Sequence, residues 1–121
     1  MPASKRHYFY LWRHSYVDEV TGNIVTRNCF GITGNIDDRQ NGYEGHVGHT
    51  IRFARVWSCA EPRLIRELES RVKADFNEYL VRGHRNYRYE WIDESVLFDD
   101  IVKYVEWEVQ GLIGVEEMVN E

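Results

Sequence analysis

The chain has 121 residues, of which 43% are hydrophobic and 29% charged, as in a single soluble globular domain. No apolar run approaches the roughly 20 residues that span a bilayer, and the basic N-terminus lacks the long apolar region of a secretory signal. Cys29 and Cys59 lie at no metal-binding spacing, which argues against a structural zinc site or a disulfide framework and favours the reducing cytoplasm.

The formal net charge of −5 conceals two parts of opposite sign. Residues 1–88 hold 14 Lys and Arg against 10 Asp and Glu, a balance of +4, whereas residues 89–121 hold one Lys against 10 acidic residues, a balance of −9. The overall acidity argues against a nucleic-acid partner, yet the first part retains enough basic residues for a phosphate-binding face. A basic domain balanced by a solvated acidic tail explains the same counts.

The N-terminal quarter predicts a long antiparallel hairpin. Residues 7–17 are aromatic and β-prone, residues 18–23 form a turn cluster, and residues 24–31 are typical of the returning strand. With the turn centred near Thr21 and Gly22, we expect Tyr10 to lie opposite Thr33. The alternation of side chains along a strand places three aromatic residues on one face: Tyr8, Tyr10 and Trp12.

The returning strand leads into a glycine turn and a short helix. Gly31 ends the strand, a Thr-Gly-Asn turn follows, and Asn35 has the character of an N-cap for a helix over residues 36–41 that carries Arg39. A strand, a turn, a capped helix start and a fixed arginine together describe a place for an anion. An ordinary strand-to-helix turn is the alternative.

Residues 50–59 predict a third strand, and residues 61–80 give the clearest helical pattern in the chain. Glu69 lies on the flank of the apolar stripe of this helix, beside Ile65, Val72 and Phe76. A carboxylate at the edge of the core needs a partner, because burial of an unpaired charge is unfavourable. An arginine, a metal ion or a flanking salt bridge would each serve.

The acidic last quarter completes the expected fold. Residues 84–92 predict an edge strand or extended loop, and residues 94–110 predict a helix that Asp93 or Ser95 caps. Hairpin-first strands followed by helices indicate an α+β fold in which a small three-stranded antiparallel sheet is flanked by helices. We expect one domain over residues 1–110 and a short C-terminal tail over residues 111–121.

Two of these stretches resemble the GIY-YIG nuclease superfamily. Cys29-Phe30-Gly31, Thr33 and Arg39 are similar to the YIG strand, the turn and the catalytic arginine of that family, and Tyr43 stands one helical turn later, where the family often carries His or Tyr. Tyr8-Phe9-Tyr10 resembles the GIY strand loosely. Glu69, on a helix after the third strand, is similar to the family's metal-binding glutamate, and residues 90–92 (Glu-Trp-Ile) resemble a signature of a phage-associated branch.

The resemblance implies a metal-dependent endonuclease that hydrolyses DNA, most readily double-stranded DNA, as a monomer or homodimer. It implies that Tyr10, with Tyr43 as second candidate, accepts the proton of the attacking water, that Arg39 holds the scissile phosphate, and that Glu69 binds Mg²⁺, for which Mn²⁺ would substitute. Gly31 would allow close backbone approach to the phosphate. Further phosphate or DNA contacts would come from Thr33, Arg27, Arg52, Arg55 and Arg66.

Cys29 departs from the family pattern, since it replaces the tyrosine of YIG, and Tyr8-Phe9 keep neither the Gly nor the Ile of GIY. These departures leave other functions open. One is a catalytically impaired module that only binds DNA, a second is an interaction protein that uses the acidic C-terminal helix against a basic partner, and a third is a nuclease for RNA or branched DNA.

Overall fold

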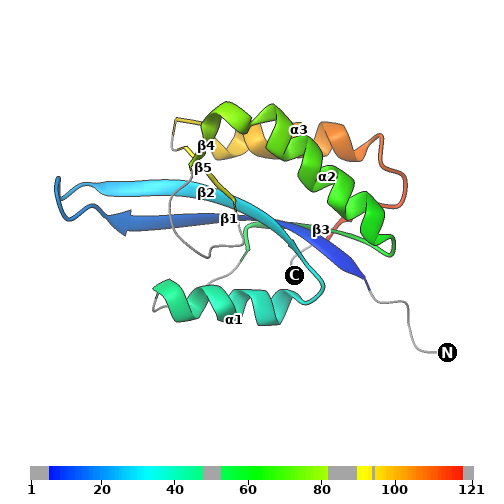
Figure 1. Ribbon diagram of the computed structural model, residues 1–121, viewed down its shortest axis with the longest axis horizontal. Helices are drawn as coiled ribbons and strands as arrows, with labels where there is room; N and C mark the ends of the chain where they lie inside the picture. Colours follow the sequence, from blue (N-terminus) through cyan, green and yellow to red (C-terminus); the bar gives the residue numbers. More distant parts are fainter. Residues whose placement is uncertain (1–5, 48–52, 82–89, 94, 119–121) are drawn as a thin grey trace.

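The computed structural model describes residues 6–47, 53–81, 90–93 and 95–118. They form an α+β domain built on one antiparallel sheet of six strands in the order β4-β5-β2-β1-β3-β6 (Figure 1). The strands are β1 (His7–Val17), β2 (Ile24–Thr33), β3 (Arg55–Cys59), β4 (Leu80–Val81), β5 (Glu90–Ile92) and β6 (Glu116–Glu117). The helices are α1 (Ile36–Val47), α2 (Pro62–Asp75) and α3 (Phe98–Val109), and η1 (Asn77–Tyr79) is a single 3₁₀ turn.

The β1–β2 hairpin is the longest part of the sheet, and its register differs from the expected one. Tyr10 lies opposite Gly31, and Tyr8 lies opposite Thr33, so the predicted pairing of Tyr10 with Thr33 is wrong by two residues. The turn centre lies one residue earlier than expected because Asp18 closes the loop: its N–H donates to the Asn23 carbonyl oxygen (2.9 Å). A shift of two residues leaves every side chain on its predicted face.

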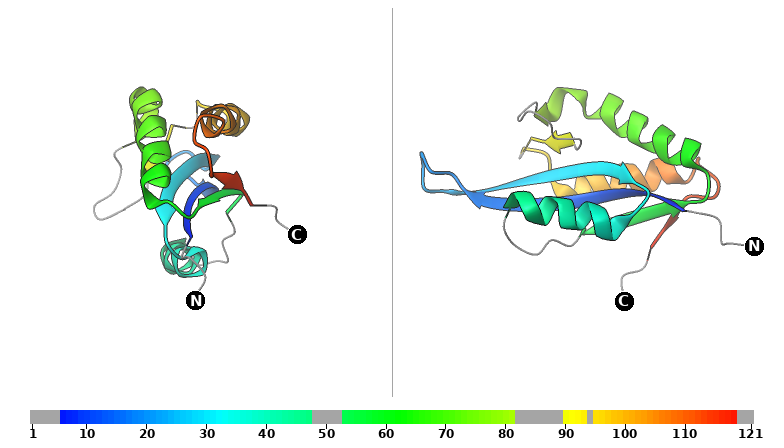
Figure 2. Two further views of the ribbon diagram at one scale, coloured as in Figure 1. Left: turned by 90° about the vertical axis from the view of Figure 1, so that its right-hand side faces the viewer. Right: turned by 60° about the horizontal axis from the view of Figure 1, so that its bottom comes forward.

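The two faces of the sheet carry separate clusters. Tyr10, Trp12, Cys29, Phe53 and Val56 are buried on the face that α1 covers through Ile36. The opposite face lies beneath α2 and α3, as Figures 1 and 2 show. Its buried side chains come from the strands, from both helices and from the segment after α3: Phe9, Leu11, Phe30, Trp57, Cys59, Ile65, Leu68, Val72, Ile92, Ile101, Val102, Val105, Leu112 and Val115.

The sheet has more strands than the three expected, because short strands pair with both edges of the predicted core. β5 pairs with β2, β4 pairs with β5, and β6 pairs with β3. The third strand begins at Arg55, while residues 50–52 of the predicted span lie outside the described residues. A two-residue strand has no sequence pattern of its own, so only tertiary pairing defines β4 and β6.

The helix boundaries differ from the predictions for local reasons. α1 continues to Val47 instead of ending at Asn41. α2 ends at Asp75, where the chain turns through η1 to reach β4, so the predicted end at Leu80 is too late. α3 begins at Phe98 with Leu97 as its N-cap. The predicted caps are wrong, since the Asp93 carboxylate instead accepts a hydrogen bond from the Ser95 N–H (2.9 Å).

Residues 111–118 of the segment predicted as a tail pack on the folded domain. Leu112 and Val115 are core residues, and β6 pairs with β3. The N–H of Met118 donates to the Val56 carbonyl oxygen (2.8 Å), which extends this contact. None of the helices described is long and apolar enough to cross a membrane.

Candidate phosphate-binding site

The turn from β2 into α1 is fixed by its own side chains. The Asn35 carboxamide oxygen accepts a hydrogen bond from the Asp38 N–H (3.1 Å), which confirms Asn35 as the N-cap. The Thr33 hydroxyl accepts from the Asn35 N–H (3.1 Å) and donates to the Asn35 carbonyl oxygen (3.0 Å). Arg39 reaches back along the turn, and its Nη2 donates to the Ile32 carbonyl oxygen (3.3 Å). The guanidinium is therefore tied to the end of β2.

A pocket of ≈ 210 Å³ opens where this turn meets the first turns of α2. Ile32, Thr33 and Gly34 line it from the turn, and Pro62, Ile65 and Arg66 line it from α2, with His7 from the start of β1. In Figure 1 these three elements converge at the end of the sheet opposite the hairpin turn. The pocket thus brings together two residues predicted to contact phosphate, Thr33 and Arg66, and it adjoins Arg39 through Ile32.

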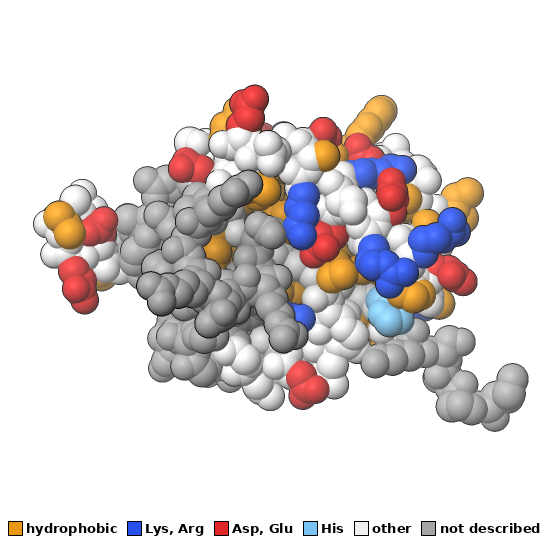
Figure 3. All heavy atoms as spheres, viewed as in Figure 1, with side chains coloured by type: hydrophobic (Ala, Val, Ile, Leu, Met, Phe, Trp, Pro, Cys, Tyr) orange, Lys and Arg blue, Asp and Glu red, His pale blue; other side chains and the backbone are white. Residues whose placement is uncertain are grey.

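The surroundings of the pocket favour an anion. Arg66 is exposed and has no ion pair within the described parts of the chain. The first turn of α2 holds no acidic residue, and Glu61 at the N-cap makes no side-chain capping hydrogen bond. The first turn of α2 therefore has no side-chain capping acceptor among the described residues. In Figure 3 several Lys and Arg side chains lie at this end of the molecule, with Asp and Glu side chains among them.

Glu69 lies on the same side of α2 as the pocket-lining Ile65, one helical turn further along. Its carboxylate is 3.6 Å from the Lys73 ammonium group, and its side chain is 19% exposed. This ion pair is the flanking salt bridge that the sequence left open as a partner. No group of three or more His, Cys, Asp or Glu side chains with the geometry of a metal site occurs among the residues described.

Tyr10 is buried on the face of the sheet that α1 covers. Its side chain is 0% exposed, and its ring stacks on Phe53 with centroids 4.1 Å apart. The ring lies over Gly31, where a Cβ atom would come within 2.7 Å of Tyr10 Cζ. Gly31 therefore makes room for Tyr10, and close approach of its backbone to a phosphate stays a prediction.

Tyr8 is better placed than Tyr10. It is partly exposed, lies on the same face, and pairs with Thr33 at the mouth of the turn. The sequence placed three aromatic residues on this face but could not tell which of them remains accessible. The answer depends on how far α1 and Phe53 cover the sheet, and neither is a property of the strand itself.

Two further residues singled out in the sequence, Cys29 and Arg55, have side chains whose surroundings the structure describes. Cys29 is fully buried among aromatic residues, including Trp12 and Trp91. Arg55 binds both carboxylate oxygens of Glu117, at 2.7 Å from Nη2 to Oε1, and lies 3.9 Å from Glu106. These acidic neighbours, the Glu117 hydrogen bond first, raise the pKa of Arg55 and already compensate its charge. The side chains of Arg27 and Tyr43, and all of Arg52, lie outside the described residues.

His7 and Gly34 are pocket residues that the sequence reasoning missed. The hairpin pairs Tyr8 with Thr33, so the residues next to this pair, His7 and Gly34, belong to the same end of the hairpin. A correct turn centre would have placed both at this end, but it would not have shown that a pocket forms there.

Comparison with known proteins adds no relative. No family model, curated protein or solved structure matches this chain.

Proposed function

We propose that the protein is a metal-dependent endonuclease that hydrolyses DNA phosphodiester bonds through a GIY-YIG-type site at the β2–α1 turn. The pocket between this turn and α2 carries the proposal, because it unites the glycine turn, Thr33 and Arg66 beside the fixed Arg39. A helix with an arginine after the hairpin and a helix with a glutamate after the third strand are the arrangement that the family resemblance implies.

In this proposal the scissile phosphate lies at the pocket mouth. The planar fork of Arg39 suits two phosphate oxygens, and Arg66 neutralises the same or the next phosphate. Thr33 supplies a hydroxyl donor, and the start of α2 supplies backbone N–H groups. Tyr8, which is accessible beside Thr33, takes the role first given to Tyr10 and accepts the proton of the attacking water.

Glu69 supplies a single carboxylate, so a magnesium ion at this site would also need phosphate oxygens of the substrate as ligands. Mg²⁺ commonly keeps several waters and takes one or two carboxylates together with substrate phosphates. Glu69 offers one partly accessible carboxylate on the pocket side of α2. Its ion pair with Lys73 would break when the carboxylate binds the metal ion. When bound, the ion would polarise the phosphoryl group and stabilise negative charge on the leaving oxygen.

The test is nicking of supercoiled plasmid in Mg²⁺ by wild type and by Arg39→Ala. We expect a loss of at least about 10²-fold, the order seen when one preorganised charge donor is removed from an active site. Arg63→Ala is the matched control, because Arg63 is exposed on α2 and does not line the pocket. Arg39→Ala protein that remains folded and cuts as fast as wild type would rule out this site.

A second candidate is a DNA-binding module without catalysis. The complete burial of Tyr10 and the cysteine at position 29 favour it, because neither position of the two family tyrosines then presents a phenol to water. Salt-dependent DNA affinity that requires Arg66, with no cleavage in Mg²⁺ or Mn²⁺, would establish this function instead.

A further inference from the structure

The turn of the β1–β2 hairpin exposes a cluster of aliphatic side chains far from the candidate site. Val17, Val20 and Ile24 are 60%, 93% and 76% exposed, and together they form what we call the hairpin tip. The hairpin projects beyond the helices in Figures 1 and 2. Turns normally carry Gly, Asn, Asp, Pro or Ser, so a valine at the top of one needs an explanation.

The tip is held in one conformation. The Asp18 carboxylate accepts hydrogen bonds from the N–H groups of Val20 (2.8 Å) and Thr21 (3.3 Å). The Gly22 N–H donates to the Asp18 carbonyl oxygen (2.7 Å), and Gly22 adopts a φ of 74° that favours glycine. A preordered apolar tip loses little conformational entropy when it docks into a partner.

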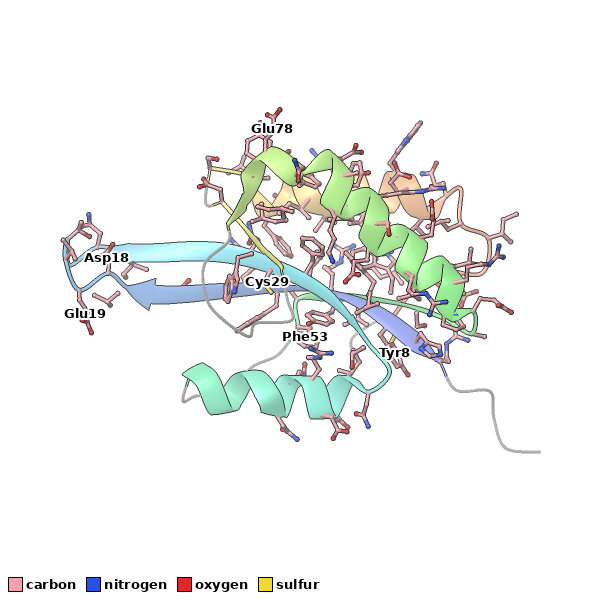
Figure 4. All side chains as sticks on the ribbon, in the orientation of Figure 1. Tyr8, Asp18, Glu19, Cys29, Phe53 and Glu78 are labelled. Carbon is pink, nitrogen blue, oxygen red and sulfur yellow. The ribbon has the colours of Figure 1, made fainter. Side chains whose placement is uncertain are left out.

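The charges of the tip restrict what it can contact. Asp18 and Glu19 directly precede Val20, and Figure 4 shows both at the hairpin end of the molecule. Two carboxylates would repel a DNA groove and an anionic lipid surface, and they would also repel a second copy of the same tip. The complementary surface is an apolar recess with a cationic rim.

The chain itself carries such a recess at its other end. Ile32, Pro62 and Ile65 give the pocket apolar walls, and Arg66 and His7 give it a basic rim. Tyr8, at the pocket end of the sheet, lies at the opposite end from Asp18 and Glu19 in Figure 4. We infer that the hairpin tip of one copy docks into the pocket of a second copy, with Val20 against the apolar walls and the carboxylates beside Arg66.

This contact is head-to-tail, so it propagates into open chains and does not close into a two-fold dimer. One hairpin tip buries far less than the roughly 1,200 Å² of a stable interface, so the association is weak and depends on concentration. A docked tip also occupies the proposed phosphate pocket, so self-association would keep DNA out of it.

Sedimentation velocity over a concentration series, without nucleic acid, tests the inference. Wild type is expected to show an average mass that rises with concentration through dimer and longer species. Val20→Asp and Arg66→Glu are each expected to remain monomeric. Ile113→Asp, which changes another aliphatic residue that is 91% exposed, and Arg63→Glu, which reverses a charge outside the pocket, are expected to associate like wild type.

Mixing the two defective variants gives the sharpest result. Val20→Asp retains its pocket and Arg66→Glu retains its tip, so an equimolar mixture should form one-to-one dimers and nothing larger. A monomeric wild type at all concentrations would overturn the inference. Association that Val20→Asp abolishes and Arg66→Glu leaves intact would also overturn it, because it would indicate contact between tips. Since no DNA is present, neither outcome depends on the proposed cleavage.

Discussion

Gly31 has no side chain, and this lets the Tyr10 ring pack against the strand on the face of the sheet beneath α1. The two residues are cross-strand partners, and the tyrosine ring fills the space above the glycine. Aromatic cover of a strand glycine restores packing that the glycine alone would lack. The pair therefore stabilises the hairpin, and it also removes Tyr10 from water.

Gly31→Ala should lower the free energy of unfolding by about 1–3 kcal/mol, the range for overpacking of a closely packed site. The added methyl group would meet Tyr10 Cζ at 2.7 Å, so the ring or the strand has to move. Urea denaturation measures the change. Gly42→Ala in α1 is the control, since a Cβ there meets nothing within 4 Å and should stabilise the helix by about 0.5–1 kcal/mol. Equal effects of the two substitutions would contradict the packing assigned to Tyr10.

At the scale of elements, α1 is positioned by its N-cap residue and by one side chain in its second turn. Asn35 caps the helix, and the Gln40 carboxamide oxygen accepts a hydrogen bond from the Phe53 N–H (3.0 Å), which ties α1 to the segment before β3. The cap could be read from the sequence, because Asn before a helical stretch is a local signal. The Gln40 contact could not, because it joins residues 13 positions apart.

Asn35→Ala should lower the free energy of unfolding by about 1 kcal/mol, because the Asp38 N–H loses its acceptor. Asn41→Ala is the matched control: Asn41 is exposed within the same helix, where alanine has the higher helix propensity. Thermal denaturation of both variants decides the point. A loss of stability in Asn41→Ala as large as in Asn35→Ala would argue against a specific cap.

α2 and α3 are joined by Tyr104, whose hydroxyl donates to the Arg71 carbonyl oxygen (3.0 Å). Burial, and after it a hydrogen bond with Asp75, raise the pKa of Tyr104 well above its usual value of 10.0. The neutral phenol is thus favoured in the folded state, so its contribution to stability is complete below pH 10 and decreases as the pH rises beyond it.

Tyr104→Phe should lower stability by about 1 kcal/mol near neutral pH through the lost hydrogen bond. Above pH 10 the variant should lose stability less steeply than wild type, because the phenol that titrates mainly in the unfolded chain is absent. Urea midpoints between pH 8 and pH 11 measure both effects. Parallel pH curves for the two proteins would show that Tyr104 is not linked to folding.

For the whole molecule, the sequence predicted what depends on local pattern. The hairpin, the third strand, the two amphipathic helices and the α+β class follow from alternation and helical spacing. The pairing of β3 with β1 instead of β2 was not predicted, because it joins segments that are remote in sequence. β4 and β6 are strands only because they pair with β5 and β3, so no local sequence pattern could predict them. Leu112 and Val115 were assigned to a tail because their segment is too short to show a period, although both are buried.

The site was predictable to the same degree. The turn, the N-cap and the arginine after it are contiguous in sequence, and the structure brings Thr33 and Arg66 to one pocket. Accessibility was not predictable, because the burial of Tyr10 depends on Phe53, which is remote in sequence. The partner of Glu69 was not predictable either, because the sequence allowed an arginine, a metal ion or a flanking salt bridge, and the structure shows an ion pair with Lys73.

Plasmid nicking by Glu69→Gln in Mg²⁺, beside wild type and Glu67→Gln, tests whether the protein is a metal-dependent nuclease. Glu67 is an exposed carboxylate on the same helix, paired with Arg71 at 3.1 Å, so its replacement controls for loss of charge on α2. We expect wild type and Glu67→Gln to nick at similar rates in Mg²⁺ and to stop in EDTA, while folded Glu69→Gln nicks at least about 10²-fold more slowly. Equal nicking by Glu69→Gln and wild type, or no nicking by wild type in either Mg²⁺ or Mn²⁺, would contradict this proposal.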